Sequence, residues 1–328
     1  MKVCVVGAGA VGGLIGARLA AAGQSEVSAV ARGDTLRALR GHGWRLRQGA
    51  SLVQGPVAAV ADPGELGVQD LVVIAVKAPA MRAVAARIAP LLGSATIVLP
   101  AMNGVPWWFT NGLSALGPEP LHSVDPGGAI AAAIPQRHVV GCVVHVSAAT
   151  AEPGLVVHKV GDGLIIGDGD GGNPVRVEAL KALLDHAGFD VSISPSIRRD
   201  LWYKLWGNLT INPVSAITGA TADRILDDPL VRDFCSAAMR EAAAIGARIG
   251  CPIDQSPDAR HAVTRALGAF KSSMLQDAER RRPLELDAIV TAVQEIGARV
   301  GVTTPTIDAL LGLARLYGRV HGVYPALQ

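Results

Sequence analysis

The opening residues of this chain place the strongest constraint on its fold. A short apolar run over residues 2–6 leads into Gly7, Gly9 and Gly12, which complete a G-x-G-x-x-G pattern. Gly7 permits a tight turn, Gly9 lets a pyrophosphate approach the backbone, and Gly12 lets the next helix pack closely on the strand. That helix, predicted over residues 10–22, directs free N–H groups at its N-terminus toward phosphates. The pattern therefore predicts a dinucleotide-binding strand–turn–helix unit.

The predicted contacts extend through the whole glycine-rich turn. We expect six consecutive residues to line the dinucleotide: Gly7, Ala8, Gly9, Ala10, Val11 and Gly12. A secretory signal peptide is an alternative explanation of so apolar an N-terminus. We reject it because glycines interrupt the run, Arg18 lies inside it, and dinucleotide binding explains the glycine spacing better.

The residue after the second predicted strand indicates which dinucleotide is bound. NAD-specific folds usually carry Asp or Glu at this position, and NADP-specific folds carry Arg near it. The strand predicted over residues 27–31 is followed by Arg32, whose guanidinium can hold a 2′-phosphate through two hydrogen bonds. The alternative is an ordinary surface arginine, with Asp34 capping the next helix. Arg32 therefore favours NADP(H) over NAD(H).

Length and composition are typical of a two-domain enzyme. A chain of 328 residues exceeds one ordinary core, and 50% of its residues are apolar while 18% are charged. The net charge is only +2 and the densest basic cluster is Arg280–Arg282, so we expect no nucleic-acid partner. No apolar run approaches the roughly 18–20 residues that cross a bilayer, so we expect no membrane partner.

Cysteine and histidine usage adds two expectations. The four cysteines are far apart and form no C-x-x-C pair. This usage indicates buried thiols in a reducing compartment, and hence a cytoplasmic protein. The eight histidines show no metal-ligand spacing, so we expect no bound metal.

Strand and helix patterns alternate along the first part of the chain. Strands are predicted at residues 2–6, 27–31, 70–76 and 95–99, and helices at residues 10–22, 34–41 and 79–91. This rhythm predicts an α/β fold with a Rossmann-type, doubly wound parallel sheet. Further strands, at residues 139–148, 154–159 and 164–167, are expected to extend the same sheet as antiparallel edge strands. A helix at residues 175–187 and a strand at residues 189–193 complete the prediction for this part.

From residue 197 onward the pattern is helical. The predicted helices span residues 197–219, 229–250, 258–280, 284–301 and 304–318, with no strand pattern between them. We therefore predict an NADP-binding Rossmann domain over residues 1–195. An all-helical domain over residues 196–328 is expected to carry substrate-binding and catalytic residues.

A polar stripe stands out on the first of these helices. Lys204, Asn208 and Asn212 recur every four residues in an otherwise apolar segment. At 3.6 residues per turn they project from one face. Burying a cation and two amides without partners would cost a few kcal/mol each, so they need polar partners. Those partners are either a polar ligand or loops of the protein itself.

Two polar residues are expected at the edge where the parallel strands end, which is where open α/β sheets bind ligands. Lys77 follows the strand at residues 70–76, and we expect it near the cofactor phosphates or ribose. Asn103 follows the strand at residues 95–99, within reach of the nicotinamide ribose or a substrate oxygen. The alternatives are a surface lysine at a helix start and a simple Asn-Gly turn.

Ser273 and Glu285 are further candidates in the helical domain. They flank the end of one predicted helix and the start of the next, where Pro283 suits the first turn. Glu285 would then lie near a helix N-terminus, where its charge is favoured. From the residues alone, a capping carboxylate and a helix-surface hydroxyl explain these two positions at least as well as a site does.

Taken together, these motifs resemble the ketopantoate reductase (2-dehydropantoate 2-reductase) family. The resemblance covers nearly the whole chain, and its last two segments are not general features of Rossmann folds. The matching segments are the glycine-rich turn, Arg32-Gly33, Val76-Lys77, Asn103-Gly104, Trp202-x-Lys204-Leu205 with Asn208 and Asn212-Pro213, and Ser273-Met274-Leu275-Gln276-Asp277 followed by Glu285.

The resemblance implies a fold and a reaction. Members of this family pair an N-terminal Rossmann domain with a C-terminal helical domain, and the active site lies between the two. They use NADPH to reduce ketopantoate, a 2-keto acid, to D-pantoate on the route to pantothenate and coenzyme A. The implied cofactor is therefore NADPH/NADP⁺, and the implied partner is a small 2-keto acid.

The resemblance also implies roles for single residues. Lys204 matches the general acid that protonates the forming alkoxide, and Glu285 matches a residue that assists it and contacts the cofactor. Substrate hydrogen bonds are implied for Asn208, Asn212 and Ser273. Cofactor phosphate contacts are implied for Arg32 and Lys77, and a place between cofactor and substrate is implied for Asn103.

Three other functions remain open at this level. A reductase of the same fold that acts on another 2-keto or 2-hydroxy acid would keep both the cofactor and Lys204. A non-catalytic NADP-binding sensor tends to lose the acid, whereas Lys204 and Glu285 are both present. Hydroxyacid dehydrogenases of the 6-phosphogluconate type share the two-domain plan, but the segment Ser273–Asp277 disfavours them.

Pocket shape and assembly are the least constrained properties. The aromatic run Trp107–Phe109 follows Asn103, and it either reshapes the substrate pocket or packs under the loop that follows. A homodimer through the apolar helical domain is expected only by analogy with this architecture.

Overall fold

The structure, a computed structural model, describes residues 1–169 and 173–326. By its internal contacts the chain divides into two units. The first comprises Met1–Trp108 and Gly128–Asp200, and the second comprises Phe109–Gly127 and Leu201–Gln328. The second unit therefore includes a segment from the first half of the sequence, Phe109–Gly127, which we call the recruited loop. The sequence-based boundary after residue 195 stays a prediction.

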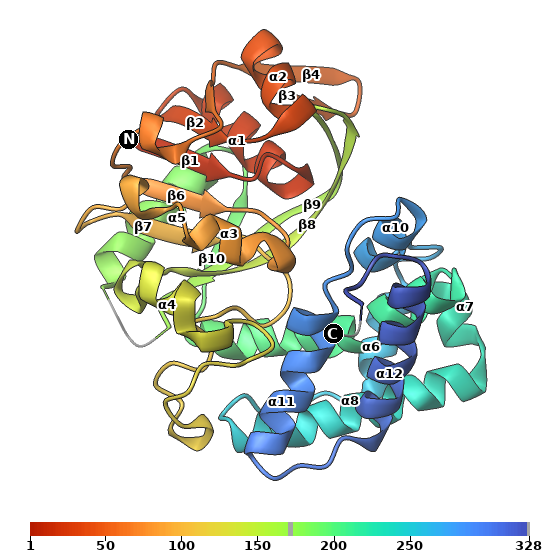
Figure 1. Cartoon of the computed structure of the whole chain (residues 1–328). Coiled ribbons are helices and arrows are strands. Elements are labelled where there is room, and N and C mark those ends of the chain that lie inside the picture. Colours follow the sequence, from red (N-terminus) through yellow and green to blue (C-terminus); the bar gives the residue numbers. More distant parts are fainter. Residues whose placement is uncertain (170–172, 327–328) are drawn as a thin grey trace. The chain divides into compact units, whose positions relative to one another are not determined.

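The first unit contains a parallel sheet in which the strand order is β5-β2-β1-β6-β7 (Figure 1). Its strands are β1 (Lys2–Val6), β2 (Glu26–Val30), β5 (Ala58–Val60), β6 (Leu71–Ile74) and β7 (Ile97–Pro100). The helices that follow are α1 (Ala10–Ala22), α2 (Gly33–His42) and α3 (Met81–Ala85). From β1 the chain adds β2 and β5 on one side and then β6 and β7 on the other. This strand order is that of a Rossmann half-sheet. The predicted fold class is confirmed.

Two details of this half differ from the sequence prediction. The helix expected over residues 79–91 is only α3, flanked by the 3₁₀ turns η2 (Ala78–Ala80) and η3 (Ala89–Leu91). Each turn contains a proline, which cannot donate a backbone hydrogen bond inside a helix. The sequence reading also missed β5 and a short hairpin formed by β3 (Trp44–Gln48) and β4 (Ser51–Gly55).

The expectation that later strands extend the first sheet is wrong. The predicted short strands are two long ones, β8 (Gly141–Glu152) and β9 (Leu155–Gly167), which pair antiparallel. They belong to a second sheet, in which β9 runs parallel to β3 and to β10 (Asp190–Ile193), and β4 lies beyond β3. Strand β9 pairs with β3 of the unpredicted hairpin and not with a strand of the first sheet.

Helix α1 packs against strands of both sheets, and its glycines permit this. A methyl group on Gly13 would come within 2.5 Å of the Val156 side chain on β9, and one on Gly16 within 2.5 Å of the Trp44 ring on β3. Arg18 anchors the same helix through a hydrogen bond to the carbonyl of Gly188 at 2.8 Å. The glycine-rich start of the chain therefore serves packing as well as the turn.

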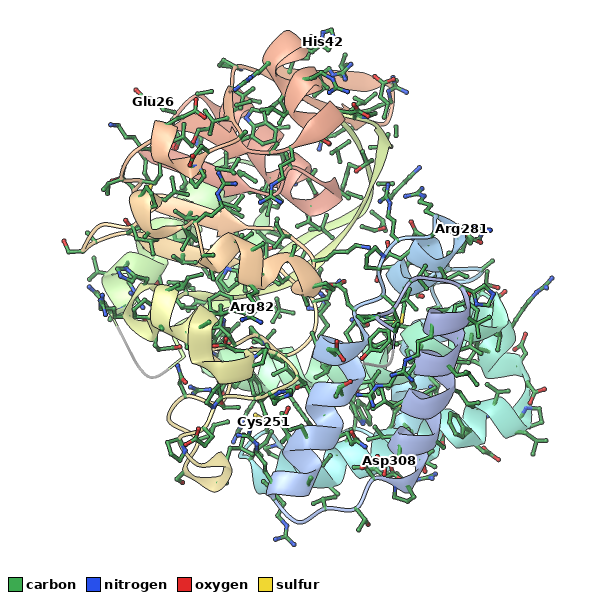
Figure 2. The ribbon with its side chains drawn as sticks, in the orientation of Figure 1. Glu26, His42, Arg82, Cys251, Arg281 and Asp308 are labelled. Carbon is green, nitrogen blue, oxygen red and sulfur yellow. The ribbon has the colours of Figure 1, made fainter. Side chains whose placement is uncertain are left out.

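Within its described residues, the second unit consists of helices and the loops that connect them, with no strand. Its helices are the greater part of α6 (Ile197–Thr218), then α7 (Ala222–Asp227), α8 (Pro229–Arg248), α9 (Pro257–Arg265), α10 (Ser273–Glu279), α11 (Ala292–Arg299) and α12 (Pro305–Val320). The helix predicted over residues 258–280 is two helices, α9 and α10, separated at Gly268, whose φ is 66°. After α10 the chain turns through Arg281, which has a φ of 51° and is exposed with Arg280 and Arg282 (Figure 2).

Candidate active site

Four of the predicted cofactor residues lie at one edge of the first sheet. Gly7 follows β1, Arg32 follows β2, Lys77 follows β6 and Asn103 follows β7. Because these strands run parallel, their carboxyl ends meet at the same edge, where doubly wound sheets bind ligands. The structure therefore brings together residues that are separated by up to a hundred positions in the sequence.

The glycine-rich turn leaves room for a ligand at one position and none at another. A methyl group on Gly12 would collide with the carbonyl oxygen of Gly7 and approach the side chain of Ala75 to 2.9 Å. A methyl group on Gly9 would meet nothing within 4 Å. Gly9 is also the N-cap of α1 and provides no side-chain cap. The open space at Gly9, beside unsatisfied helix N–H groups, fits the pyrophosphate of a dinucleotide.

Arg32 lies at the N-terminus of α2 as its N-cap residue and is exposed. Asp34, which the alternative interpretation made the cap, forms an ion pair with Arg37 in the first turn instead. The side chain of Arg32 lines a small pocket together with Arg87, which follows α3. Sequence reasoning passed over Arg87, because nothing in its local pattern distinguishes it from a surface arginine.

Lys77 lies two residues farther from the end of its strand than predicted, and Asn103 lies one residue closer, because β6 ends at Ile74 and β7 at Pro100. Strand β6 ends at Ile74, and Lys77 is the N-cap residue of the 3₁₀ turn Ala78–Ala80, without a capping hydrogen bond from its side chain. Asn103 occupies a bend before Gly104, whose φ of 82° agrees with the Asn-Gly turn that was the alternative at this position. Both side chains are half-buried.

In the second unit, helix α6 has two chemically opposite faces. The indole N–H of Trp202 donates to the Ala242 carbonyl at 3.2 Å, and that of Trp206 donates to the Met239 carbonyl at 2.7 Å. Both carbonyls belong to α8, which these tryptophans pack against. Lys204 lies two residues from each, about 200° around the helix axis. Lys204 therefore lies opposite the aromatic face, and Asn208 and Asn212 follow about 40° and 80° further around the axis.

The polar stripe becomes more buried along the helix. Lys204 and Asn208 are half-buried, whereas Asn212 is only 5% exposed. Three residues after Asn212, the Ser215 hydroxyl hydrogen-bonds to the hydroxyl of Ser272. This bond holds the start of α10 against the far end of the stripe, so Ser273 lies beside it. The structure thus joins two motifs that are about sixty residues apart.

The neighbouring serines Ser272 and Ser273 have different surroundings. Ser272 is buried and caps α10, accepting a hydrogen bond from the Leu275 N–H at 3.0 Å. Ser273, the predicted substrate ligand, is exposed. The exposure of Ser273 agrees with the alternative of a helix-surface hydroxyl, and the cap of α10 is its neighbour Ser272. Ser273 therefore lies on the solvent-exposed side of α10.

Glu285 lies one residue before an irregular helix start. The helical residues begin at Leu286, and Asp287–Thr291 form a π-helical turn that continues into α11. Pro283 precedes this helix and does not form its first turn, contrary to expectation. Glu285 is only 8% exposed, and its carbonyl accepts the Ile289 N–H at 3.2 Å. Single π turns often mark functional positions, because they redirect side chains next to them.

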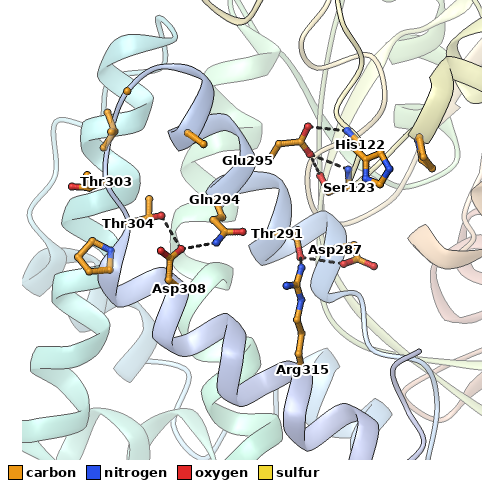
Figure 3. A pocket seen from close by; sticks show the side chains of 15 residues that line it. His122, Ser123, Asp287, Thr291, Gln294, Glu295, Thr303, Thr304, Asp308 and Arg315 are labelled. Atoms are coloured by element: carbon orange, nitrogen blue, oxygen red, sulfur yellow. Dashed lines mark hydrogen bonds between the residues drawn. The ribbon is translucent and has the colours of Figure 1, made fainter. Parts of the chain in front are cut away.

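A large hollow within the second unit lies away from these residues. It has a volume of about 1240 Å³ and lies between α11, α12 and the loop at residues 122–126 (Figure 3). None of the residues with a predicted role lines it. One wall is the carboxylate of Glu295, which accepts hydrogen bonds from the backbone of His122 and Ser123. Its polar groups hold the recruited loop on the helices.

The aromatic run after Asn103 packs in the protein interior. Trp107, Trp108 and Phe109 are all buried. The indole of Trp107 donates to the Ile134 carbonyl at 3.3 Å, and the Phe109 ring stacks on Trp202 at 5.9 Å between centroids. These contacts favour the interpretation that the run supports the loops.

Across residues 1–169 and 173–326 there is no group of three or more His, Cys, Asp or Glu side chains arranged to hold a metal ion. Over the same ranges, none of the helices is both long enough and apolar enough to cross a membrane.

Comparison with known families gives matches to both parts of the chain. Residues 3–171 match the profile described as Ketopantoate reductase PanE/ApbA, and residues 196–318 match that of its C terminal part. A 2-dehydropantoate 2-reductase of Mesorhizobium japonicum is 42% identical over 325 residues, which cover 99% of this chain and 100% of that protein.

Solved structures give the same result. A putative ketopantoate reductase from Ralstonia solanacearum is 56% identical, with a TM-score of 0.94 over 98% of this chain and 99% of that one. A 2-dehydropantoate 2-reductase from Geobacter metallireducens is 28% identical, with a TM-score of 0.84 over 96% of this chain and 99% of that one. D-mandelate dehydrogenase, solved with NADH and anilino(oxo)acetate, shares the fold at 21% identity, with a TM-score of 0.83 over 98% of this chain and 100% of that one.

Proposed function

The chain belongs to the ketopantoate reductase PanE/ApbA family of oxidoreductases, and from that premise we propose that it reduces 2-dehydropantoate to D-pantoate with NADPH. The observation that carries this proposal is the polar stripe of α6. Lys204, Asn208 and Asn212 follow one side of a helix that two buried tryptophans anchor to α8, so the helix presents the stripe in a fixed direction. A fixed ammonium beside fixed amides suits a small keto acid that carries hydroxyl and carboxylate groups.

NADPH, when bound, would supply the hydride that attacks the keto carbon. The open space at Gly9 and the guanidinium of Arg32 are the features of this chain that would hold it, with Ala8, Ala10 and Val11 along the turn. Lys77 and Asn103, at the same sheet edge, would contact its phosphate or ribose groups. Arg32 is our reason for NADPH in preference to NADH.

The protein's own part in the chemistry falls to the second unit. Negative charge builds on the keto oxygen in the transition state, and the ammonium of Lys204 would stabilise it and then donate a proton. Glu285 would orient that ammonium. Asn208, Asn212 and Ser273 would hydrogen-bond the substrate, because a polar site rejects ligands that leave its groups unpaired.

Steady-state kinetics with a set of substitutions at Lys204 tests the proposal. We expect ketopantoate to give the highest kcat/KM among a panel of 2-keto acids. The rate is measured as the decrease in NADPH absorbance. Lys204→Ala should lower kcat by about 10²–10⁴-fold, the usual contribution of a general acid. Lys204→Arg should keep substrate affinity but not kcat, because arginine does not release its proton. Lys159→Ala, at an exposed position on β9, is the matched control.

Two results would count against the proposal. A higher kcat/KM with another 2-keto acid would keep the oxidoreductase and its acid but change the substrate. Full activity in Lys204→Ala would show that Lys204 is not the general acid, and it would refute the proposed role of the polar stripe.

The same proposal includes a homodimer and a cytoplasmic location. Leu313, Leu316 and Val320 form an exposed apolar row on α12, with spacings that place them on one face. We expect a second copy of the chain to cover this row. Light scattering should give twice the chain mass for the native protein and a single chain mass for Leu316→Glu. The cytoplasm is expected because biosynthetic reductases with this cofactor act there.

A further inference from the structure

A small pocket lies where the first two strands of the Rossmann sheet end. Val6 closes β1 and Val30 closes β2, and both contribute to its apolar floor with Pro63 and Val84. The two charged residues that line it are Arg32, from the start of α2, and Arg87, from the turn after α3. Two guanidinium groups from separate elements therefore border one shallow apolar surface.

Arg87 has only a weak partner in this structure. It forms an ion pair with Asp62 at 3.4 Å, and the two side chains are 42% and 62% exposed. Exposed pairs of this kind contribute little to stability, because water and salt screen the charges. Asp62 is itself engaged as the cap of the 3₁₀ turn Pro63–Glu65, accepting the Gly64 N–H at 3.0 Å. A stronger anion can take Arg87 from Asp62 at little cost.

We propose that Arg87 is a second binding residue for the 2′-phosphate of NADP(H), acting with Arg32, and that Asp62 competes with the phosphate for it. This inference rests on the proposed NADPH dependence. In folds of this type the adenosine 2′ position lies at the end of the second strand, where Arg32 is. A phosphate dianion gains charge-assisted hydrogen bonds from each guanidinium that reaches it, which a ribose hydroxyl does not.

The competition gives the site a means of selection. When the ligand has a 2′-hydroxyl, Arg87 stays paired with Asp62 and adds nothing to binding. When the ligand has a 2′-phosphate, the ion pair is exchanged for a stronger one. Arg87 therefore affects the ratio of NADPH to NADH affinity more than either reaction rate.

Equilibrium binding to the full chain tests this without any substrate. The dissociation constants of NADPH, NADH, 2′,5′-ADP and 5′-AMP are measured by calorimetry for four variants. We expect Arg87→Ala to weaken NADPH and 2′,5′-ADP about tenfold and to leave NADH and 5′-AMP unchanged. Asp62→Asn should strengthen NADPH several-fold, and this gain should vanish in the Arg87→Ala background. Arg82→Ala removes an exposed arginine of α3 that does not line the pocket, and it should change nothing (Figure 2).

The outcomes separate this inference from the function on which it rests. If the native chain prefers NADPH and Arg87→Ala keeps that preference, the role of Arg87 is overturned while the proposed cofactor stands. An equal loss of NADPH and NADH affinity in Arg87→Ala also overturns it, because the residue would then serve the adenosine or the fold. If the native chain prefers NADH, both proposals are wrong. Thermal unfolding of each variant shows whether it is folded.

Discussion

Glu295 on α11 binds Ser123 of the recruited loop through two hydrogen bonds. Its Oε2 accepts the Ser123 hydroxyl at 2.7 Å and the Ser123 backbone N–H at 2.9 Å, while Oε1 accepts the His122 N–H at 2.8 Å. Arg299, one turn later, forms an ion pair with Glu295 at 2.6 Å and donates to the carbonyls of Glu119 and Pro120. Two residues of α11 thus hold residues 119–123 against this helix within the second unit.

This arrangement predicts a pH dependence of stability. Burial alone would raise the pKa of Glu295, but the hydrogen bonds from Ser123 and from the His122 backbone, with that from Arg299, lower it below its usual range. A carboxylate with a lowered pKa in the folded state stabilises the protein above its unfolded pKa of about 4.3 and loses this effect as pH falls through the folded pKa. Glu295→Gln should therefore be destabilised at pH 7 and match the native chain in strong acid.

Urea unfolding of the native chain and the variant across this pH range measures the difference. We expect about 1–3 kcal/mol at neutral pH, the usual contribution of hydrogen bonds to a charged group. Glu178→Gln, at an exposed position on α5 (Pro174–His186), is the matched control. A Glu295→Gln deficit that is constant with pH would show that shape, and not charge, holds the loop.

Gly9 and Gly12 offer a test that separates cofactor binding from folding. Gly9→Ala meets open space, so its thermal midpoint without ligand should match that of the native chain. Its NADPH affinity should fall at least tenfold, because the methyl group occupies the space left for the pyrophosphate. Gly12→Ala should lower the thermal midpoint itself, because its methyl group collides with the backbone of Gly7. Undiminished NADPH affinity in Gly9→Ala would refute the binding role of the turn.

Ser272 and Ser273 should respond in opposite ways to the same substitution. Ser272→Ala removes the cap of α10 and the bond to Ser215, and it should cost about 0.5–2 kcal/mol in the free energy of unfolding. Ser273→Ala should leave stability unchanged and raise KM for ketopantoate. Denaturation and kinetics on the two variants decide this. If Ser272→Ala instead raised KM and Ser273→Ala lowered stability, the substrate contact would belong to Ser272.

The thiols should be unreactive in the folded protein. All four cysteines are buried, and burial raises the pKa of Cys4 and of Cys235 to about 11. Because the thiolate is the reactive form, we expect no labelling by a disulfide reagent at pH 8 until the chain is denatured, when four thiols should react. Rapid labelling of the native protein would reveal local opening around one of these sites.

The amino-acid sequence by itself determined the Rossmann sheet, the helical second part and the family. These features are local, because the glycine spacing sets a turn and helix start, and the four-residue spacing of Lys204, Asn208 and Asn212 sets a helix face. The motif order along the chain carried the family resemblance. Such patterns need no knowledge of distant contacts.

Three features could be seen only in the tertiary structure. They are the second sheet, the inclusion of residues 109–127 in the helical unit, and the pocket that Arg32 and Arg87 both line. Strand β9 chooses its neighbours by long-range hydrogen bonds, and its local pattern is the same in either sheet. Arg87 and Ser272 likewise look ordinary in sequence, since their roles depend on what lies opposite them in space. Local propensity selects helix or strand, whereas long-range packing selects which elements meet.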